Sequence, residues 1–399
     1  MAIKDLYKGK PKAEKRGKRW SADYTTRAGK RVTQRFDTKT EAEAWHAERL
    51  KEKRAGATVD FREGQRTTVS MLWPDFRDRL LAGGARGGTP SSRKTMSSYD
   101  AIYKNYIEPK WGSAPLGNIR YNDIEDWIST LQGVAGGPAS DTLRQEVAKK
   151  FRTLMDHAVR RQYIQMNPAK DAIGRADYIP RPKTVKAHTY LTMAQLRSLA
   201  DNCAGYTDMI LTAGLCGLRF GEVTALQVQD VQLGKRPQLR VWQAYSDVRG
   251  TVTLGPTKTG LERSVPLPKA LADILAIRIA DRPAGARVWD APNGGLIRHG
   301  SFTKPGSRFA KAKAAAIAAA PADDPFPNLT FHDLRHTAVS LHISAGSNVK
   351  VVQEIAGHQD ATVTLNTYAG LFESDRHDSA ARVNKAFGAL TRKSLEIQR

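Results

Sequence analysis

The sequence predicts a multidomain, mainly α-helical protein with small β elements. At 399 residues and 40% hydrophobic content, the chain is long enough for two or three domains with full cores. Apolar residues recur at helical spacing from about residue 67 onward, whereas strand-like alternation is confined to two short stretches. A segment rich in Pro, Gly and cations, residues 170–189, has no sustained periodicity and is interpreted as an interdomain linker. We therefore expect three regions, at residues 1–62, 67–174 and 185–399.

The charge of the chain favours an anionic partner. The formal net charge is +23 and the pI is about 10.0. Lys and Arg are spread along the whole chain, which suits a long polyanion, so nucleic acid is the first expectation and an anionic membrane the second. A membrane binder would concentrate its cations beside an apolar stripe on one helix, and no such helix is evident.

The same composition indicates a cytoplasmic protein. No run of about 18 apolar residues occurs, and no apolar stretch follows the basic residues 1–18, so neither a membrane span nor a secretory signal is expected. Cys203 and Cys216 are too few for a disulfide framework or a thiolate zinc site, which fits a reducing compartment.

In the first region the sequence predicts a small basic β-sheet with one helix packed on it. Up to Arg35 it holds 12 Lys and Arg against 3 Asp and Glu. "KRWSADYTT" and "KRVTQRF" alternate around a turn signal at residues 28–30, and Thr38 with Glu41 has capping-box spacing at the start of a helix. Such a sheet, with Trp20 nearby, can place a β-ribbon in a DNA groove, or it is simply a solvated module. The candidate DNA contacts here are Lys18, Arg19, Arg31 and Arg35.

The second region reads as all-helical. Leu72, Phe76 and Leu80 recur at helical spacing, and so do Ile124 and Ile128, which predicts a bundle of four or five helices. The basic loop "GGARGGTPSSRKT", residues 83–95, interrupts it. This loop is either a connector or a phosphate contact, with Arg93 and Lys94 as the candidates.

Two stretches after the linker place a cation where it could bind an anion. In "AGLCGLRFGEVTAL", glycines interrupt an apolar helix and a new helix is expected near Phe220. Arg219 would stand beside the open amides of that helix, with Glu222 orienting it. In "TVTLGPTKTGLERSVPL", alternation on both sides of residues 259–260 predicts a hairpin with Lys258 close to its tip. Each cation alone is more typical of ordinary structure or a solvated surface.

The stretch "LTFHDLRHTAVSLHISAG" predicts a helix between Thr330 and Gly346 with a buried apolar stripe. His332 and Arg335 are three positions apart, so we expect them to share the opposite, exposed face and to meet a ligand together.

A zinc site is the alternative in this helix, because His332 and His336 are four positions apart as in zinc proteases. That pattern needs a Glu at the position of Asp333 and a third ligand further on. Arg335 between the two imidazoles would also repel the metal. The sequence therefore favours no metal here.

The stretch "GHQDATVTLNTYAGLF" carries the last two candidates. A short helix should end at Gly357, and further helical turns should bring Tyr368 back near His358. By itself Tyr368 is either an amphipathic aromatic with its hydroxyl at the surface or a nucleophile.

In chain order these motifs resemble the tyrosine recombinase family, the phage integrases in particular. That family carries Arg, a Lys on a β-hairpin, His-x-x-Arg, His or Trp, and Tyr. The matching motifs are "GLRFGE", "TKTG", "HDLRHT" and "GHQDATVTLNTYAG", within residues 185 to about 375. On layout and charge, residues 67–174 are similar to the core-binding domain, and residues 1–62 to the three-stranded arm-binding module of certain phage integrases.

The resemblance implies a site-specific DNA recombinase that integrates and excises a phage or mobile-element genome. Its nucleophile would form a 3′-phosphotyrosyl link and release a 5′-hydroxyl. Because that link preserves the energy of the broken bond, neither ATP nor a metal or other cofactor is expected. Two arginines and two histidines would bind the phosphate, and the lysine would protonate the leaving oxygen. The implied catalytic residues are Tyr368, Arg219, Lys258, His332, Arg335 and His358, with Glu222 supporting Arg219.

The expected partners follow from the same resemblance. They are double-stranded DNA with core and arm attachment sites, three further copies of the chain in a tetramer, and an accessory excision factor or host DNA-bending protein. The segment "DSAARVNKAFGALTRK" carries Val383, Phe387 and Leu390 on one helical face, which suits docking on a neighbouring protomer and packing in cis equally well.

Two other classes remain open from the sequence. A type IB topoisomerase would share the chemistry but relax supercoils as a monomer, and the basic N-terminal region favours the recombinase. A non-catalytic DNA-binding regulator would need only the charge.

Overall fold

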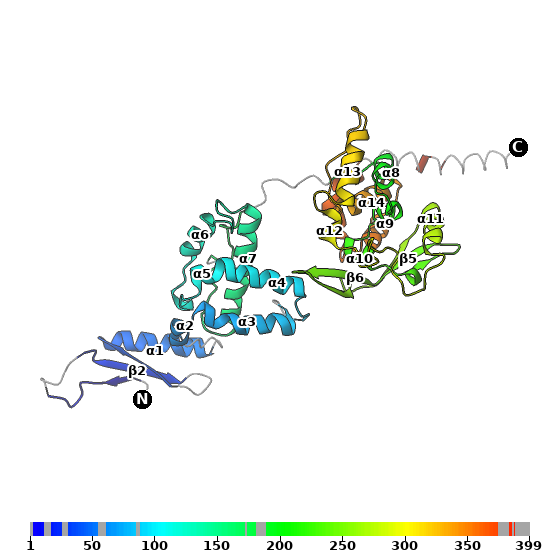
Figure 1. Cartoon of the computed structure of the whole chain (residues 1–399). Coiled ribbons are helices and arrows are strands. Elements are labelled where there is room, and N and C mark those ends of the chain that lie inside the picture. The colour runs from blue at the N-terminus through cyan, green and yellow to red at the C-terminus, as the bar shows by residue number, and fades with distance from the viewer. Residues whose placement is uncertain are drawn as a thin grey trace. The chain divides into compact units, whose positions relative to one another are not determined.

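The chain folds into two compact units, Met1–Val185 and Lys186–Arg399 (Figure 1). The structure is a computed structural model. None of the helices it describes is long and apolar enough to cross a membrane. The described residues are 3–11, 17–25, 31–54, 61–84, 88–171, 174–180, 189–373, 383, 384 and 387.

The predicted N-terminal sheet and helix are both present. Strands β1 (Ile3–Asp5), β2 (Trp20–Thr25) and β3 (Arg31–Phe36) form an antiparallel sheet in that order. Helix α1 (Lys39–Arg54) packs on the face that buries Ala22, Tyr24 and Val32. Thr38 and Glu41 make the expected reciprocal capping bonds, both 3.2 Å long. The predicted turn at residues 28–30 lies outside the described residues.

A helical bundle forms the rest of the first unit, in agreement with the predicted four or five helices. A π-helical turn, Tyr103–Ile107, joins α4 to α5 without a break, so the two make one long rod. Aromatic side chains fill the core, where the Trp111 and Phe151 rings stack 5.6 Å apart. The helices are α2 (Phe61–Arg66), α3 (Val69–Gly83), α4 (Arg93–Ile102), α5 (Glu108–Trp111), α6 (Tyr121–Ser129) and α7 (Asp141–Arg160).

The bundle extends further along the chain than predicted. The first part of the presumed linker, up to Pro180, folds back onto it: the Tyr178 hydroxyl donates to the Ala169 carbonyl at 3.1 Å, and the Tyr121 and Tyr178 rings meet edge to face. Helix α2 also packs closely, since a Cβ added at Gly64 would lie 2.0 Å from the Tyr163 carbonyl oxygen. The Pro-rich and Gly-rich composition correctly indicated where helical periodicity stops. The packed unit continues beyond that point because Tyr178 makes buried contacts with the bundle.

The second unit is built around one buried helix. Helix α9 (Thr207–Cys216) is apolar on nearly all sides and packs against α8 (Met193–Asp201) and α14 (Asp333–Ser344). Thr192 and Gln195, three positions apart, form a capping box at the start of α8. The other helices are α10 (Phe220–Ala225), α11 (Lys269–Ile279), α12 (His299–Thr303), α13 (Arg308–Ala319), α15 (Val349–Ala356) and α16 (Ala361–Glu373).

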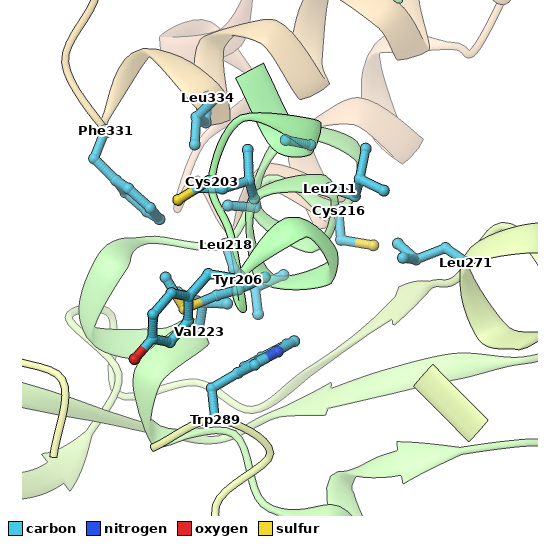
Figure 2. Close-up of a cluster of buried hydrophobic side chains, with 14 of the residues drawn as sticks. Cys203, Tyr206, Leu211, Cys216, Leu218, Val223, Leu271, Trp289, Phe331 and Leu334 are labelled. Atoms are coloured by element: carbon cyan, nitrogen blue, oxygen red, sulfur yellow. The ribbon is translucent and has the colours of Figure 1, made fainter. Parts of the chain in front are cut away.

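The core around α9 encloses both cysteines. Figure 2 shows Cys203 and Cys216 among Leu218, Leu271 and other apolar side chains. Both thiols are free, and burial raises the pKa of Cys216 to about 12. Burial also raises the pKa of Cys203, to about 11, so neither thiol is reactive at neutral pH.

The predicted hairpin over residues 251–267 is wrong. Strand β7 (Thr251–Pro256) pairs with the preceding β6 (Gln243–Val248) through a two-residue turn, Arg249-Gly250, in which both residues have positive φ. Strand β8 (Arg263–Pro266) belongs to the other sheet, in which β5 (Gln238–Val241) lies between β4 (Val231–Gln232) and β8. Alternation indicates that a stretch forms a strand but does not determine which strand it pairs with. The turn near residues 259–260 therefore joins two strands that do not pair with each other.

Candidate phosphoryl-transfer site

Arg219 and Glu222 are held together at the start of α10. Gly217 ends α9 in the left-handed conformation, and Arg219 is the residue that precedes the first turn of α10. The Glu222 carboxylate reaches back and accepts both the Arg219 backbone N–H and its Nη1, each at 2.9 Å. The expected orientation of Arg219 by Glu222 therefore has a direct geometric basis.

A second arginine, which the sequence did not single out, shares this carboxylate. Arg263 on β8 donates Nη2 to Glu222 Oε2 at 2.7 Å and Nη1 to Oε1 at 3.2 Å. Burial alone would raise the pKa of Glu222, but the bonds and charges of Arg263 and Arg219 outweigh it and lower the pKa to about 2. One carboxylate thus holds two guanidinium groups. Only the pairing of the strands could reveal this contact, because Arg263 is 41 positions from Glu222 in the sequence.

Arg335 is buried, contrary to the expectation of an exposed face shared with His332. Its side chain is 3% exposed, and Nη1 donates to the Gly217 carbonyl at 2.7 Å while Nη2 donates to that of Ala356. These carbonyls lie at the C-terminal ends of α9 and α15, where the helix dipoles favour a cation. Helical spacing gave the wrong face because α9 and α15 also cover that side of α14.

The cation cluster has an excess of positive charge. Burial, followed by the charge of Arg219, lowers the pKa of Arg335 to about 9, so it remains protonated at neutral pH. Among the described residues, no carboxylate forms a salt bridge with Arg335, although Glu222 is close enough to offset part of the pKa shift. Three guanidinium groups and one carboxylate make a site that an anion would complete.

His332 and His358 lie at the edge of this cluster and are neutral at pH 7. Partial desolvation, then Arg335, lowers the pKa of His332. The same causes lower the pKa of His358 to about 4. His358 follows the left-handed Gly357 that ends α15, as predicted, and its Nδ1 lies 2.9 Å from the buried Thr364 hydroxyl.

Lys258 is exposed on the turn between β7 and β8. The Gly260 N–H donates to the Thr257 carbonyl and the Thr257 hydroxyl to the Leu261 carbonyl, which shapes the turn. The positive charge of Lys258 contributes to the lowered pKa of His332, so this lysine acts on the same site. It does so although the predicted hairpin around it was wrong.

Tyr368 is buried, and its hydroxyl contacts a residue other than His358. The side chain is 2% exposed and packs on Val339 and Val352. The hydroxyl lies 2.7 Å from Nδ1 of His336, the histidine that the sequence raised only as a zinc ligand. Burial raises the pKa of Tyr368 to about 12, although Arg335 acts in the opposite direction. Backbone angles at Tyr368 (φ −125°, ψ 18°) break α16 at this point.

The cations predicted in the first unit are mostly paired. Lys18 lies 4.0 Å from Asp37, Arg19 3.0 Å from Asp5, and Arg31 3.1 Å from Asp23. Arg35 is exposed on β3 and, by strand alternation, shares a face with Arg31, opposite the face covered by α1.

Arg93 and Lys94 were predicted to lie in a loop, but they form the exposed first turn of α4. The Ser92 side chain caps that turn by accepting the Thr95 N–H, and this local bond overrides the loop-like composition.

The site can bind an anion through two arginine side chains and place a tyrosine hydroxyl near it. In the described part of the chain, no three His, Cys, Asp or Glu side chains gather to hold a metal. Buried arginines near a tyrosine hydroxyl are the arrangement expected of an enzyme that transfers a phosphodiester to its own side chain.

Comparison with known proteins names the family. Residues 189–374 match the phage integrase family. The chain is 24% identical to a XerC-like tyrosine recombinase of Caldanaerobacter subterraneus subsp. tengcongensis, over 90% of this chain and 93% of that protein. It is also 24% identical to a putative prophage phiRv2 integrase of Mycobacterium tuberculosis, over 91% and 92%. Residues 189–374 therefore belong to the phage integrase family of tyrosine recombinases, enzymes that cut and rejoin DNA strands.

Two solved structures share its fold. The Tn1549 transposon integrase, in complex with a circular intermediate DNA, matches with a TM-score of 0.61 at 20% identity over 75% of this chain and 94% of that one. A lambda integrase tetramer bound to a Holliday junction matches with a TM-score of 0.54 at 18% identity, over 85% and 93%.

Proposed function

We propose that this chain is a site-specific integrase that uses Tyr368 as its nucleophile and moves a phage or mobile-element genome into and out of attachment sites. It would act on the chromosome in the bacterial cytoplasm. The observation that carries the proposal is the buried Arg335 near Arg219, with Tyr368 close enough for the charge of Arg335 to act on its hydroxyl.

Strand cleavage then follows from the charges. The pentacoordinate transition state of a phosphodiester carries an extra negative charge on its non-bridging oxygens. Arg219 and Arg335 donate to these oxygens, and neutral His332 and His358 add single hydrogen bonds. Thr364 can donate its hydroxyl to Nδ1 of His358, which leaves Nε2–H to face the phosphate.

The leaving group needs a proton as the tyrosine attacks. Lys258, on its exposed turn, protonates the departing 5′-oxygen, and the phosphate remains on Tyr368 as a 3′-phosphotyrosyl link. The reverse reaction with a different 5′-hydroxyl joins the new strands without ATP.

Mass spectrometry of a trapped intermediate tests the proposal. The full chain is incubated with a nicked duplex carrying its core site, from which the released 5′-hydroxyl fragment diffuses away. We expect a covalent protein–DNA adduct whose only modified peptide contains Tyr368. No adduct, or an adduct at another tyrosine, would refute the assignment, and relaxation of plasmid that lacks any attachment site would instead indicate a topoisomerase.

The first unit would bind DNA in two ways. The basic face of β3, with Arg31 and Arg35, suits an arm site, and the helical bundle suits the core site. The solved integrases that share the fold hold DNA, which supports this division. Exchange of four strands between two duplexes calls for four protomers, and an accessory excision factor or host DNA-bending protein would assist.

The C-terminal segment is the candidate link between protomers. Val383 and Phe387 are exposed, as docking in trans requires, and Leu390 lies outside the described residues. Whether the segment docks in trans or in cis is decided by its deletion, which should prevent tetramers on DNA only in the first case.

A truncation separates arm binding from catalysis. The chain should begin at Phe61, because α2 packs on the bundle through Gly64 and is needed there. We expect such a variant to lose affinity for arm-site DNA and to cleave a nicked core site at close to the wild-type rate. Fluorescence anisotropy and single-turnover cleavage measure the two activities. Loss of core-site cleavage in the folded truncated chain would contradict the division.

A further inference from the structure

His336 is the residue that contacts the hydroxyl of the proposed nucleophile. Nδ1 lies 2.7 Å from Tyr368 Oη, and the two rings are inclined at 51° with centroids 5.7 Å apart. This distance falls within the range required of a general base and the proton it removes.

Both partners are held in place by the fold. His336 follows Arg335 on α14, and its ring meets that of His332 edge to face at 5.2 Å. The Tyr368 ring belongs to a buried cluster with Val339, Ile343, Val352 and Ala356. The contact is therefore set by a helix and a packed core rather than by a mobile loop.

The other two histidines of the site are engaged differently. Nδ1 of His358 lies at the Thr364 hydroxyl, and His332 stands on the exposed side at the start of α14. Of the three imidazoles, His336 is the one bonded to the phenol oxygen.

The phenol needs a proton acceptor. With a pKa of about 12, only about one Tyr368 in 100,000 is ionised at pH 7. Arg335 favours the phenolate, but burial outweighs it. Attack at a useful rate therefore requires that the proton leave as the oxygen–phosphorus bond forms.

We infer that His336 is the general base of strand cleavage, an inference that rests on the proposed function. The Tyr368 O–H bond breaks and its proton passes to Nδ1 of His336, while Oη bonds to phosphorus. The bond from phosphorus to the 5′-oxygen breaks, and that oxygen takes a proton from Lys258. In rejoining, the 5′-hydroxyl attacks phosphorus and gives its proton to neutral Lys258. The bond from phosphorus to Oη breaks, and the imidazolium of His336 returns its proton to the departing phenolate.

Titratable groups of the described residues also face this pair. His332 contacts His336 on the same helix, Arg335 acts on Tyr368 through its charge, and the Tyr190 ring lies 6.3 Å from that of Tyr368. The pH dependence of cleavage must be interpreted with these groups in mind.

The test compares His336→Asn with the wild type in single-turnover cleavage of a nicked core-site duplex. Asn places an amide near the position of Nδ1 but cannot accept the proton. We expect cleavage about 100-fold slower or more, with unchanged DNA binding, and a rate that continues to rise with pH where the wild-type rate has levelled. His342→Asn is the matched control, because His342 lies on the same helix with Nε2 at the Leu215 carbonyl, and it should cleave at close to the wild-type rate.

A fluorinated tyrosine at position 368 distinguishes a base from a structural role. Its phenol ionises at lower pH, so it should recover much of the rate lost in His336→Asn. A loss that the fluorinated residue does not recover would overturn the inference, and so would an unchanged or faster rate, which would make the contact a restraint on the hydroxyl. Either result leaves the proposed function intact if the wild type still forms the Tyr368 adduct, whereas no adduct in the wild type would refute that function itself.

Discussion

Tyr368→Phe is expected to abolish strand cleavage and leave DNA binding unchanged. The substitution removes one oxygen atom from a ring that stays packed on Val339, Ile343 and Val352, and it costs the fold the bond to His336, about 1 kcal/mol. No other group can form the phosphotyrosyl link from that position. Single-turnover cleavage of a nicked core site should fall below detection, while the Kd for the same DNA measured by anisotropy stays within about twofold.

Tyr190→Phe is the matched control. Its ring lies 6.3 Å from that of Tyr368 in the same cluster, and burial raises the pKa of its hydroxyl as well. It should cleave at nearly the wild-type rate. Residual cleavage by Tyr368→Phe, or equal loss in both variants, would assign the chemistry to another residue or to the packing of the cluster.

Glu222→Gln is expected to lower both stability and cleavage. The carboxylate is 2% exposed and binds Arg219 and Arg263, so its neutralisation leaves two guanidinium groups without a counter-charge next to Arg335. Removing one partner of a buried ion pair costs about 3–5 kcal/mol of unfolding free energy. The lower end is expected, because part of Arg219 reaches solvent. Cleavage should fall as well, because Arg219 loses the carboxylate that orients it.

The stability difference between wild type and Glu222→Gln should depend on pH. The pKa of Glu222 is about 2 in the folded chain, below its ordinary value of 4.5, so the carboxylate contributes its full stability above about pH 4.5. That contribution is lost progressively as pH falls toward 2. The two proteins should therefore differ most at neutral pH and converge in acid.

Urea unfolding of the full chain, followed by hydrogen exchange of peptides within residues 189–373, measures this difference. Glu262→Gln is the control, because Glu262 pairs with Arg240 at the surface, where water screens the charges. It should change stability little at any pH. A Glu222→Gln chain as stable as the wild type at pH 7 would show that the three arginines tolerate one another without the carboxylate.

Local signals in the sequence were enough for several helices and their ends. The capping boxes at Thr38 and Thr192, the left-handed glycines at 217 and 357, and the apolar periodicity of the bundle each depend on residues within about four positions. The order of the motifs also identified the family, since Arg219, Lys258, His332, Arg335, His358 and Tyr368 follow one another as they do in tyrosine recombinases.

Tertiary structure alone decided how those residues meet. Strand β7 turned back to β6 and left β8 to bring Arg263 to Glu222, and the ends of α9 and α15 buried Arg335 between their carbonyls. The Tyr368 hydroxyl, in a helix that breaks at that residue, lies beside His336, which is on a different helix. Periodicity and spacing describe one segment at a time, whereas strand partners, buried charges and the direction of a hydroxyl depend on contacts between segments distant in the chain.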